Sequence, residues 1–481
     1  MTLNFVRDFS QPEDYFLCKY DDIDGAKPIS SFEFYIQTKH IPLPFYNIER
    51  WKRIEEALEW IANVGEALTF FDFKTKFLSY LNFSAEPDLS VIASLFNQDS
   101  TAYFNKRILS SIARLALELP KQIKQPIRAL RKEENGSLTL SQLQIASLLA
   151  NAFYSTFTAR NFGEFNRINF IRLFTRKTPK AAEKLKCILH YFYQFFKNPP
   201  TGTVSIIRQK LNCELEPKWD EIECPLVNLN ALPNGRIENE GEKMTQVDFA
   251  NEFIGGGVLG YGLVQEEIRF LICPELIISC LVCEKMEKNE AILIIGAERY
   301  SDYQGYGSTF CWKYRQRDVS SQRDAMGRVL SELLAIDALN FSHPLEQFFE
   351  GYIRRELRKA FIGFATRTAW SFDQIATGNW GCGVFGGDLH LKSLIQLMAA
   401  SLACRPLVFF TFGKKLFAQE LEETVKLLRE EGFTVGLDKP WLSVHFLVAP
   451  SGMRMDFPNP DEGKKIPKYY RSLPDENKNK R

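Results

Sequence analysis

Residues 255–267 read Gly255-Gly256-Gly257-Val258-Leu259-Gly260-Tyr261-Gly262-Leu263-Val264-Gln265-Glu266-Glu267, which places five glycines within eight residues, shortly before an acidic pair. Glycine has no Cβ, so such a loop can adopt positive φ angles and lets another molecule approach its backbone closely. Its exposed amides favour an anion, most naturally a phosphate. Because carboxylates repel phosphates, the pattern predicts a loop that holds a diphosphate while a carboxylate acts on an uncharged part of the same ligand.

The glycine spacing also admits two simpler interpretations. Gly255, Gly257 and Gly260 match the dinucleotide-binding pattern G-x-G-x-x-G, but that pattern requires a helix to open directly after its third glycine. Gly262 and the acidic pair interrupt this position, so the dinucleotide interpretation is disfavoured. A flexible glycine-rich surface loop is the alternative that composition alone leaves open.

Length, charge and cysteine usage bound the class of protein. A chain of 481 residues exceeds a single-domain core, so two domains are expected. The net charge of +1 creates no overall field for nucleic acid or membranes, so a polyanionic ligand must meet local basic residues and amides. The first ten residues lack an apolar signal core, and no uncharged apolar run reaches the roughly 18 residues of a membrane span. Ten cysteines without paired spacing, apart from the buried-looking Cys280 and Cys283, predict a reducing compartment.

The first 198 residues carry helical periodicity. Trp51, Ile54, Leu58 and Ile61 recur at three- and four-residue spacing, which predicts one apolar helix face. Further helices are expected over 70–83, 88–96, 108–119, 140–153 and 178–197. The last of these has Thr178 as N-cap and Pro179 at its first position. Residues 1–198 are therefore predicted to form a mostly helical accessory domain, with a boundary at 199–202.

The pattern changes after Gly202. Strands are predicted over 204–208, 291–297, 407–412 and 442–448, and helices over 274–285, 326–334 and 390–404. Strands that alternate with helices indicate an α/β sandwich over 199–450, with its ligands on loops beyond the strand ends. The tail at 451–481 is rich in Pro, Lys, Asp and Asn, so it is expected to be poorly ordered.

Two further loops carry candidate ligand contacts. At 378–388, Gly381, Gly383 and Gly386 again fit G-x-G-x-x-G, and here an apolar helix does follow, which favours phosphate binding over a tight structural turn. Two such loops suggest a ligand with two linked phosphates. Residues 300–307 form a polar, tyrosine-rich loop after a buried strand. A tyrosine there either stacks on a base or sugar or covers the edge of the core.

Several mechanisms lack their motifs. The five histidines are dispersed and join no serine or cysteine, which disfavours a Ser-His-Asp or Cys-His hydrolase and a histidine-rich metal site. No P-loop or kinase motif occurs. Acid–base chemistry is therefore left to carboxylates.

The combination of these motifs resembles the poly(ADP-ribose) glycohydrolases over most of residues 200–450. Members combine a macrodomain, which is a mixed sheet between helices, with a preceding helical accessory domain, so the resemblance implies the same α/β/α fold here. The matching segments, in chain order, are 236–238, 247–251, 255–267, 303–307, 378–388 and 409–413.

The resemblance also implies residue roles. Glu267 corresponds to the catalytic acid/base and Glu266 to a partner that holds ribose hydroxyls, with Asp248 a further catalytic candidate in the motif that carries the ribose contact Asn251. The other implied substrate contacts are Ile237, Glu238, Gln265 and Phe412 near adenine, Tyr303, Tyr306 and Phe385 along the cleft, and Gly255, Gly256, Gly257, Asn379, Gly381, Cys382, Gly383 and Val384 in the two glycine loops.

The implied reaction is hydrolysis of ribose–ribose O-glycosidic bonds in poly(ADP-ribose), with release of ADP-ribose. Its transition state has oxocarbenium character. Glu267 would protonate the leaving oxygen and then, as a carboxylate, activate water. We expect the acidic pair in an extended segment, with side chains on opposite sides, so that only one residue serves as acid/base. No metal or cofactor is expected.

Two alternatives share the same loops. One is a non-catalytic reader of ADP-ribose, which the two carboxylates disfavour, because they add nothing to the binding of a polyanion. The other is a hydrolase that removes the last ADP-ribose from a protein acceptor. The expected partners are poly(ADP-ribose), ADP-ribose and ADP-ribosylated proteins, without DNA, RNA or membranes. An intracellular monomer, nuclear or cytoplasmic, is expected.

Overall fold

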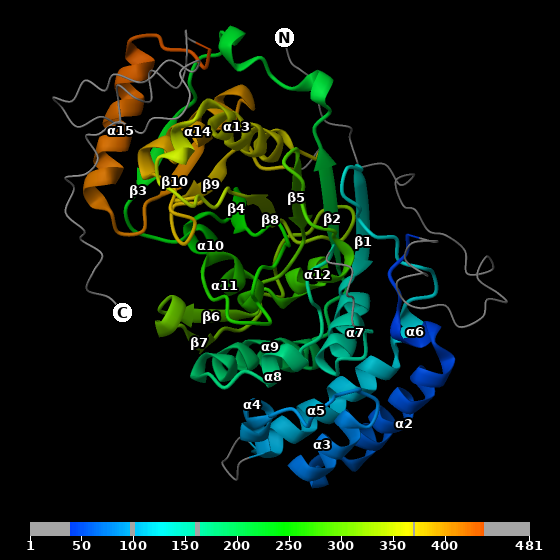
Figure 1. Cartoon of the computed structure of the whole chain (residues 1–481). Helices are drawn as coiled ribbons and strands as arrows, with labels where there is room; N and C mark the ends of the chain where they lie inside the picture. Colours follow the sequence, from blue (N-terminus) through cyan, green and yellow to red (C-terminus); the bar gives the residue numbers. More distant parts are fainter. Residues whose placement is uncertain (1–38, 97–101, 159–163, 369–370, 437–481) are drawn as a thin grey trace.

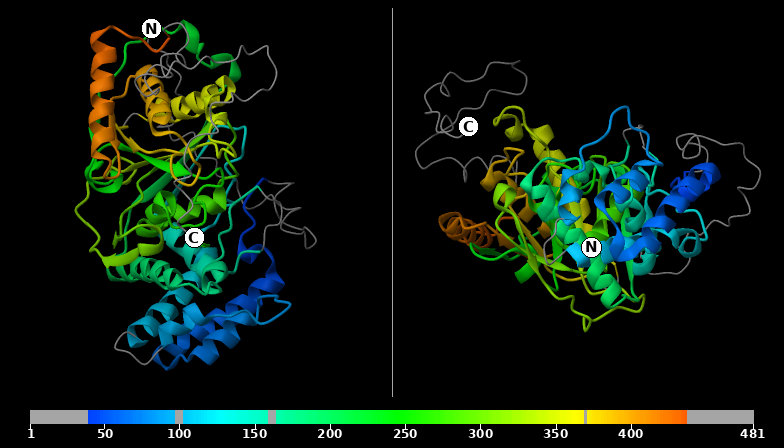
Figure 2. Two further views of the ribbon diagram at one scale, coloured as in Figure 1. Left: turned by 60° about the vertical axis from the view of Figure 1, so that its left-hand side comes forward. Right: turned by 90° about the horizontal axis from the view of Figure 1, so that it is seen from below.

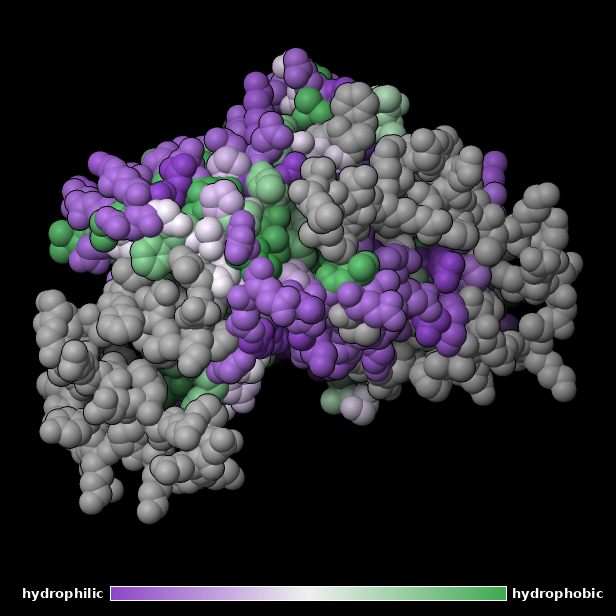
Figure 3. Space-filling view, turned by 90° about the horizontal axis from the view of Figure 1, so that it is seen from above, coloured by the Kyte–Doolittle hydropathy of each residue, from purple (hydrophilic) through white to green (hydrophobic). Residues whose placement is uncertain are grey.

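The computed structural model describes residues 39–96, 102–158, 164–368 and 371–436 (Figure 1). The strand predicted over 442–448 and the tail at 451–481 lie outside these residues. Within the described part, no helix is both long and apolar enough to cross a membrane. Seen from above, the described surface exposes mainly hydrophilic side chains, with small hydrophobic areas between them (Figure 3).

The centre of the molecule is a mixed eight-stranded sheet with the order β1-β2-β5-β8-β4-β9-β10-β3. Strands β8, β4, β9, β10 and β3 run parallel, whereas β5, β2 and β1 pair antiparallel at one side. The strands are β1 (Gly136–Ser141), β2 (Thr203–Lys210), β3 (Leu229–Leu232), β4 (Thr245–Ala250), β5 (Glu290–Ile295), β8 (Glu332–Asp337), β9 (Ile375–Gly378) and β10 (Leu407–Phe410).

Helices cover both faces of this sheet, which confirms the predicted α/β sandwich (Figures 1 and 2). Alternate residues of β5 face opposite cores, with Leu293 on one side and Ile294 on the other. The core that contains Leu293 also includes side chains of α13 (Glu350–Ala365), α14 (Leu389–Leu402) and α15 (Lys415–Glu430). On the other side lie α11 (Gln265–Ile272) and α12 (Ser279–Val282), together with Cys280 and Cys283, which are buried as predicted.

The N-terminal part is mostly helical, as predicted. Its helices are α2 (Ile48–Val64), α3 (Phe70–Leu78), α4 (Ser90–Ala93), α5 (Ala102–Leu117), α6 (Leu119–Gln122), α7 (Gln142–Phe153), α8 (Ile171–Phe174) and α9 (Pro179–Lys197). The Thr178 side chain accepts a hydrogen bond from the Ala181 amide, so the predicted cap of α9 is confirmed. Apolar side chains of these helices form one continuous core with the α11 face of the sheet.

Strand β1 was not anticipated. It lies inside the part expected to be helical and pairs antiparallel with β2, from Gly136 opposite Arg208 to Ser141 opposite Thr203. Ser141 then caps α7 through a capping box with Gln144, which sets the start of that helix. The domain boundary at 199–202 stays a prediction. Strand β1, which precedes it, pairs with β2, which follows it, so both parts contribute to one sheet.

The helix predicted over 326–334 is wrong. The Asp324 carboxylate accepts hydrogen bonds from the amides of Met326 and Arg328, and Gly327 has φ of +77°, so this stretch forms a turn. The apolar residues that follow belong to β8, which is buried between β5 and β4. A short apolar run is compatible with a helix or with a buried strand. This one forms a strand because it pairs with β5 and β4 in the centre of the sheet.

Candidate active site

The loops that carry the candidate residues meet at one edge of the sheet. The carboxyl ends of parallel strands point the same way, so the segments after β3, β4, β9 and β10 converge (Figure 1). The Asn379 side chain, after β9, donates a hydrogen bond to the Thr411 carbonyl, after β10, at 3.4 Å. The Phe412 ring lies 5.8 Å from the ring of Tyr306, which follows β6 (Ser301–Gln304).

The acidic pair lies in the first turn of α11, not in an extended segment as predicted. The helix opens at Gln265, three residues after the last glycine of the loop. Glu266 and Glu267 are 3% and 6% exposed, so their carboxylates are almost completely removed from bulk water. A negative side chain in the first turn is favoured by the helix dipole, which helps to offset this burial.

The glycine loop holds both carboxylates through its own backbone. Glu266 accepts hydrogen bonds from the amides of Gly255, at 2.6 Å, and Asn251, at 3.0 Å. Glu267 accepts from the amides of Gly257 and Val264, both at 2.9 Å. The anion that the amides of Gly255 and Gly257 bind is therefore the acidic pair itself, which resolves the apparent conflict between a glycine loop and adjacent carboxylates.

The same contact explains why two of these positions are glycines. A Cβ on Gly256 would lie 2.5 Å from Glu266 Oε2 and 2.6 Å from Glu267 Oε1, and one on Gly262 would lie 2.2 Å from Glu267 Oε1. Gly256 also has φ of +47°, a conformation that other residues rarely adopt. The loop wraps the carboxylates so closely that no side chain fits between them.

Asp248, in β4, is completely buried beside Glu266. Burial raises the pKa of Asp248 well above its ordinary value, and the charge of Glu267 adds to that effect. Burial likewise raises the pKa of Glu266, followed by the charges of Asp248 and Glu267. Burial and the neighbouring negative charges thus act in the same direction on Asp248 and Glu266, because ionising two adjacent buried carboxyls is unfavourable.

Two side chains of the helical part also hold the glycine loop, and sequence reasoning missed both. Lys184 of α9 is 2% exposed, and its Nζ donates to the carbonyls of Val258 at 2.9 Å and Gly260 at 3.0 Å. Burial lowers the pKa of Lys184 to about 8, while Glu267 opposes this shift. The Asn166 amide donates to the carbonyls of Ile254 and Gly256 at 3.0 and 2.9 Å. For Lys184 the sequence did contain a signal, because a lysine on the apolar face of the predicted 178–197 helix needs a buried partner.

The predicted adenine-side residues fall into two groups. Phe412 is 45% exposed with φ of +54°, so it is not a core residue, and Tyr306 is 41% exposed beside it. Glu238, in α10 (Ile237–Glu240), accepts a hydrogen bond from the Tyr303 hydroxyl at 2.5 Å. In contrast, Gln265 uses its side-chain amide to bind the β4 backbone at Val247 and Phe249, and Ile237 is buried.

The second glycine loop joins β9 to α14. Its residues Gly383 and Val384 are exposed, and Val384 reaches 80% exposure. The α14 helix follows directly, as predicted, and Asp388 caps it by accepting from the Leu391 amide at 2.9 Å. Its remaining predicted contacts, Gly381, Cys382 and Phe385, lie in the same turn between Asn379 and the cap.

Comparisons with known proteins agree with this architecture. Residues 216–419 match the family described as poly(ADP-ribose) glycohydrolase, macro domain fold, and residues 96–208 match its helical domain. Poly(ADP-ribose) glycohydrolase 2 of Caenorhabditis elegans is 33% identical over 460 residues, covering 90% of each chain. Poly(ADP-ribose) glycohydrolase 1 of the same organism is 39% identical over 318 residues, which are 63% of this chain but only 39% of the relative.

One solved structure that the chain matches is poly(ADP-ribose) glycohydrolase from Deinococcus radiodurans in complex with ADP-ribose. It is 14% identical, with a TM-score of 0.27, and the match covers 47% of this chain and 95% of that one.

The fold and the site define a macrodomain in which a glycine loop encloses a buried glutamate pair, preceded by a helical domain. The chain belongs to the poly(ADP-ribose) glycohydrolase family.

Proposed function

We propose that this chain hydrolyses the ribose–ribose O-glycosidic bonds of poly(ADP-ribose) and releases ADP-ribose. The observation that carries the proposal is the placement of Glu267, whose carboxylate is fixed by the amides of Gly257 and Val264 where the loops of the parallel strands meet. A carboxyl group that is held this firmly suits proton transfer, because acid–base catalysis depends on position first.

Glu267 acts as both acid and base in this proposal. In the first step, its proton moves to the adenosine ribose oxygen that leaves, and the bond between that oxygen and the anomeric carbon breaks with oxocarbenium character. In the second step, the Glu267 carboxylate takes a proton from water as the water oxygen bonds to the anomeric carbon. The proton lost in the first step is thus regained in the second.

Glu266 and Asp248 serve as positioning residues. Glu266, like Glu267, accepts an amide hydrogen bond at each oxygen, but its donors are Asn251 and Gly255 and it lies beside the buried Asp248, so we assign it to holding the ribose-side loop. Asp248 backs it from the wholly buried strand β4. A single acid/base residue is therefore retained from the sequence prediction, although the extended geometry first used to support it is not.

The remaining assignments follow the loops. We assign adenine to the wall formed by Glu238, Tyr303 and Phe412, and the diphosphate to the turn at Gly381–Val384 and to the part of the first glycine loop whose amides are not bound to the acidic pair. The division into a helical accessory domain and a catalytic domain from residue 199 to 450 is part of the same proposal. The protein is proposed to act in the nucleus or cytoplasm, on poly(ADP-ribose) that is attached to ADP-ribosylated proteins.

A reader without activity is the competing function. Two carboxylates buried at a polyanion site add nothing to affinity, so they favour an enzyme. A hydrolase that frees the protein-linked ADP-ribose would use the same residues and differs in its substrate. Incubation with purified poly(ADP-ribose), and separately with mono-ADP-ribosylated protein, followed by product chromatography, separates the three. The expected result is ADP-ribose from the polymer, whereas intact polymer would contradict the proposal.

A further inference from the structure

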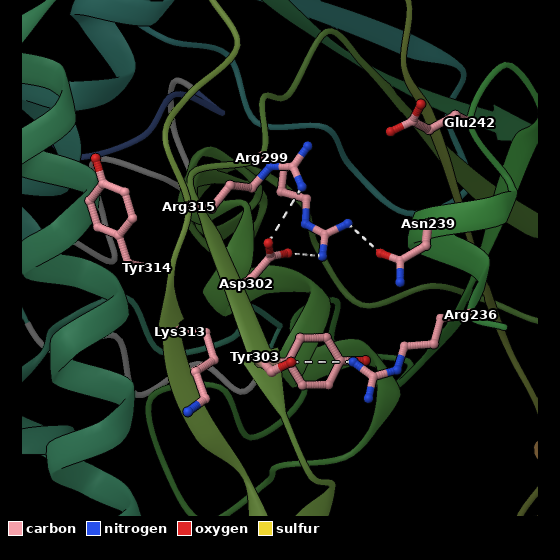
Figure 4. Close-up of a pocket in the computed structure, with 9 residues that line it drawn as sticks. All are labelled: Arg236, Asn239, Glu242, Arg299, Asp302, Tyr303, Lys313, Tyr314 and Arg315. Carbon is pink, nitrogen blue, oxygen red and sulfur yellow. Dashed lines mark hydrogen bonds and ion pairs between the residues drawn. The ribbon is translucent and has the colours of Figure 1, made fainter.

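A hollow lies beside the proposed adenine wall and shares Tyr303 with it. Its volume is about 580 Å³, and residues of three segments line it: α10 with its flanks, the strand β6 with the residues before it, and the end of β7 (Cys311–Tyr314). Figure 4 shows four cationic side chains around it. The lining residues are Arg236, Asn239, Glu242, Arg299, Asp302, Tyr303, Lys313, Tyr314 and Arg315.

The hollow is locally basic on a nearly neutral chain. Four cationic side chains face two carboxylates there, Asp302 and Glu242. Asp302 forms ion pairs with Arg299 and, at 3.5 Å, with Arg315. Lys313 is exposed and forms no ion pair with any residue that the structure describes. The positive side chains outnumber the negative ones by two, which matches the two negative charges of one diphosphate. The whole chain, in contrast, carries a net charge of only +1.

The hollow is continuous with the proposed adenine wall. The Arg236 guanidinium lies 4.3 Å from the centre of the Tyr303 ring, whose hydroxyl binds Glu238 on the other side. Arg299 donates to the Glu238 carbonyl at 2.9 Å, so the same short helix α10 borders both spaces. The β6–β7 hairpin also carries Tyr306 at its turn, next to Phe412.

We propose that this basic hollow is a polymer subsite that binds the diphosphate of the neighbouring unit beyond the adenine-side ribose. The inference rests on the proposed function. An internal unit of poly(ADP-ribose) continues through its adenine-side ribose, whereas a terminal unit ends there. A subsite beyond the adenine wall therefore engages the chain only when an internal unit occupies the active site, and it promotes internal cleavage.

The test is a double variant, Lys313→Ala with Arg315→Ala, which removes two cations that make no contact with the acidic pair. The matched control, Arg107→Ala with Lys121→Ala, removes two exposed cations from α5 and α6, far from the hollow. Three quantities are compared with the wild type: KM for long polymer, the size distribution of early products, and the Kd of free ADP-ribose.

The proposal predicts that the double variant raises KM for long polymer by about fivefold or more at low salt and releases fewer free oligomers, because each lost phosphate contact weakens polyanion binding. The Kd of the double variant for ADP-ribose stays within about twofold of the wild type. Neither side chain is among the proposed ADP-ribose contacts, and salt screens the effect of exposed charges on a ligand bound elsewhere. The control variant behaves as the wild type. An unchanged KM and product distribution, or an equal loss of ADP-ribose affinity, would overturn the subsite.

Failure of the proposed function is separable from failure of the subsite. If the wild type releases nothing from polymer, fluorescence polarisation with labelled polymer of defined length still measures binding. The subsite predicts tighter binding of polymer than of ADP-ribose, and the double variant loses that difference. Single-stranded DNA of equal charge is the final arm. Equal affinity for DNA at the hollow would show general polyanion binding and contradict a subsite for the polymer.

Discussion

Lys184 Nζ donates a hydrogen bond to the Val258 carbonyl oxygen at 2.9 Å, so a buried lysine of helix α9 holds the glycine loop that encloses Glu267, the proposed acid/base. The loop in turn fixes Glu267 through the Gly257 amide. The helical part and the catalytic loop are thus joined by a direct chain of hydrogen bonds. Residues 1–198 contribute to positioning, although the proposed ligand contacts all lie beyond residue 199.

Removal of the Lys184 ammonium is expected to slow catalysis. Lys184→Met keeps an unbranched side chain that is one atom shorter, and it leaves the carbonyls of Val258 and Gly260 without their donor. Small errors in the position of a catalytic group cost about 10²-fold in rate, so kcat should fall by about that factor. The matched control is Lys186→Met, two residues along the same helix, where the lysine is exposed and paired with Glu183. A folded Lys184→Met protein with wild-type kcat would show that the lysine only fills space.

A methyl group at Gly256 should lower the activity by more than its effect on stability explains. Gly256→Ala places a Cβ against both carboxylates and forces a positive φ on alanine. The comparison is Gly65→Ala at the end of α2, outside the ligand loops, which has a similar φ of +59° but open space around its Cβ. Both variants bear the backbone strain, of order 1–3 kcal/mol, and only Gly256→Ala displaces the acidic pair. Equal activities of the two variants would contradict the proposed enclosure.

Phe412→Ala is expected to weaken ADP-ribose binding by about 1–3 kcal/mol, the scale of a lost base–aromatic stack. The exposed ring beside Tyr306 carries this expectation, and kcat at saturation should change little. Calorimetric titration with ADP-ribose measures the loss. Unchanged affinity would assign adenine to another surface.

Glu275 should make stability depend on pH. It is buried at the junction of α7 and the catalytic part, where Gln142 and Tyr300 both donate to Oε1 at 2.8 Å. Burial, followed by the charge of Glu298, raises the pKa of Glu275 from 4.5 to about 7. The folded protein therefore keeps a proton that the unfolded chain has lost between these values, so stability falls as pH rises through that window.

The size of this effect follows from the shift. At about 1.36 kcal/mol per pKa unit, the Glu275 contribution should fall by about 3 kcal/mol between pH 4.5 and 8. Urea unfolding of wild type and Glu275→Gln across this range measures it as a difference between the two proteins, because glutamine does not titrate. Parallel stability curves for the two proteins would refute the assignment.

Local patterns in the sequence predicted the elements that local chemistry determines. The Thr178–Pro179 start of α9 and the near-continuous apolar run of β5 are examples, and both are present. Strand β1 escaped prediction because it forms through pairing with β2, a partner more than 60 residues away in sequence. The 326–334 segment was misassigned because burial on both faces hides the alternation of β8.

The candidate site shows the same division. The acidic pair and the two glycine loops were visible in the sequence, because their residue types are unusual together. Their geometry was not, since the helix at Gln265 and the amides that hold Glu266 and Glu267 depend on how the loop folds back. The contributions of Lys184 and Asn166 come from segments that are distant in sequence, so no local motif could have placed them at the loop.

The central claim is that Glu267 is the sole acid/base, and Glu267→Gln tests it most directly. Glutamine keeps the size of the side chain but cannot transfer the proton, so release of ADP-ribose from the polymer should fall by about 10²–10⁴-fold. ADP-ribose binding should persist, because the variant removes one negative charge from a site that we propose to hold a diphosphate. Single-turnover release of ADP-ribose, measured beside ADP-ribose affinity in the same preparation, gives both numbers. Near-wild-type release by a Glu267→Gln protein that still binds ADP-ribose would contradict the account and move the acid/base to Glu266 or Asp248.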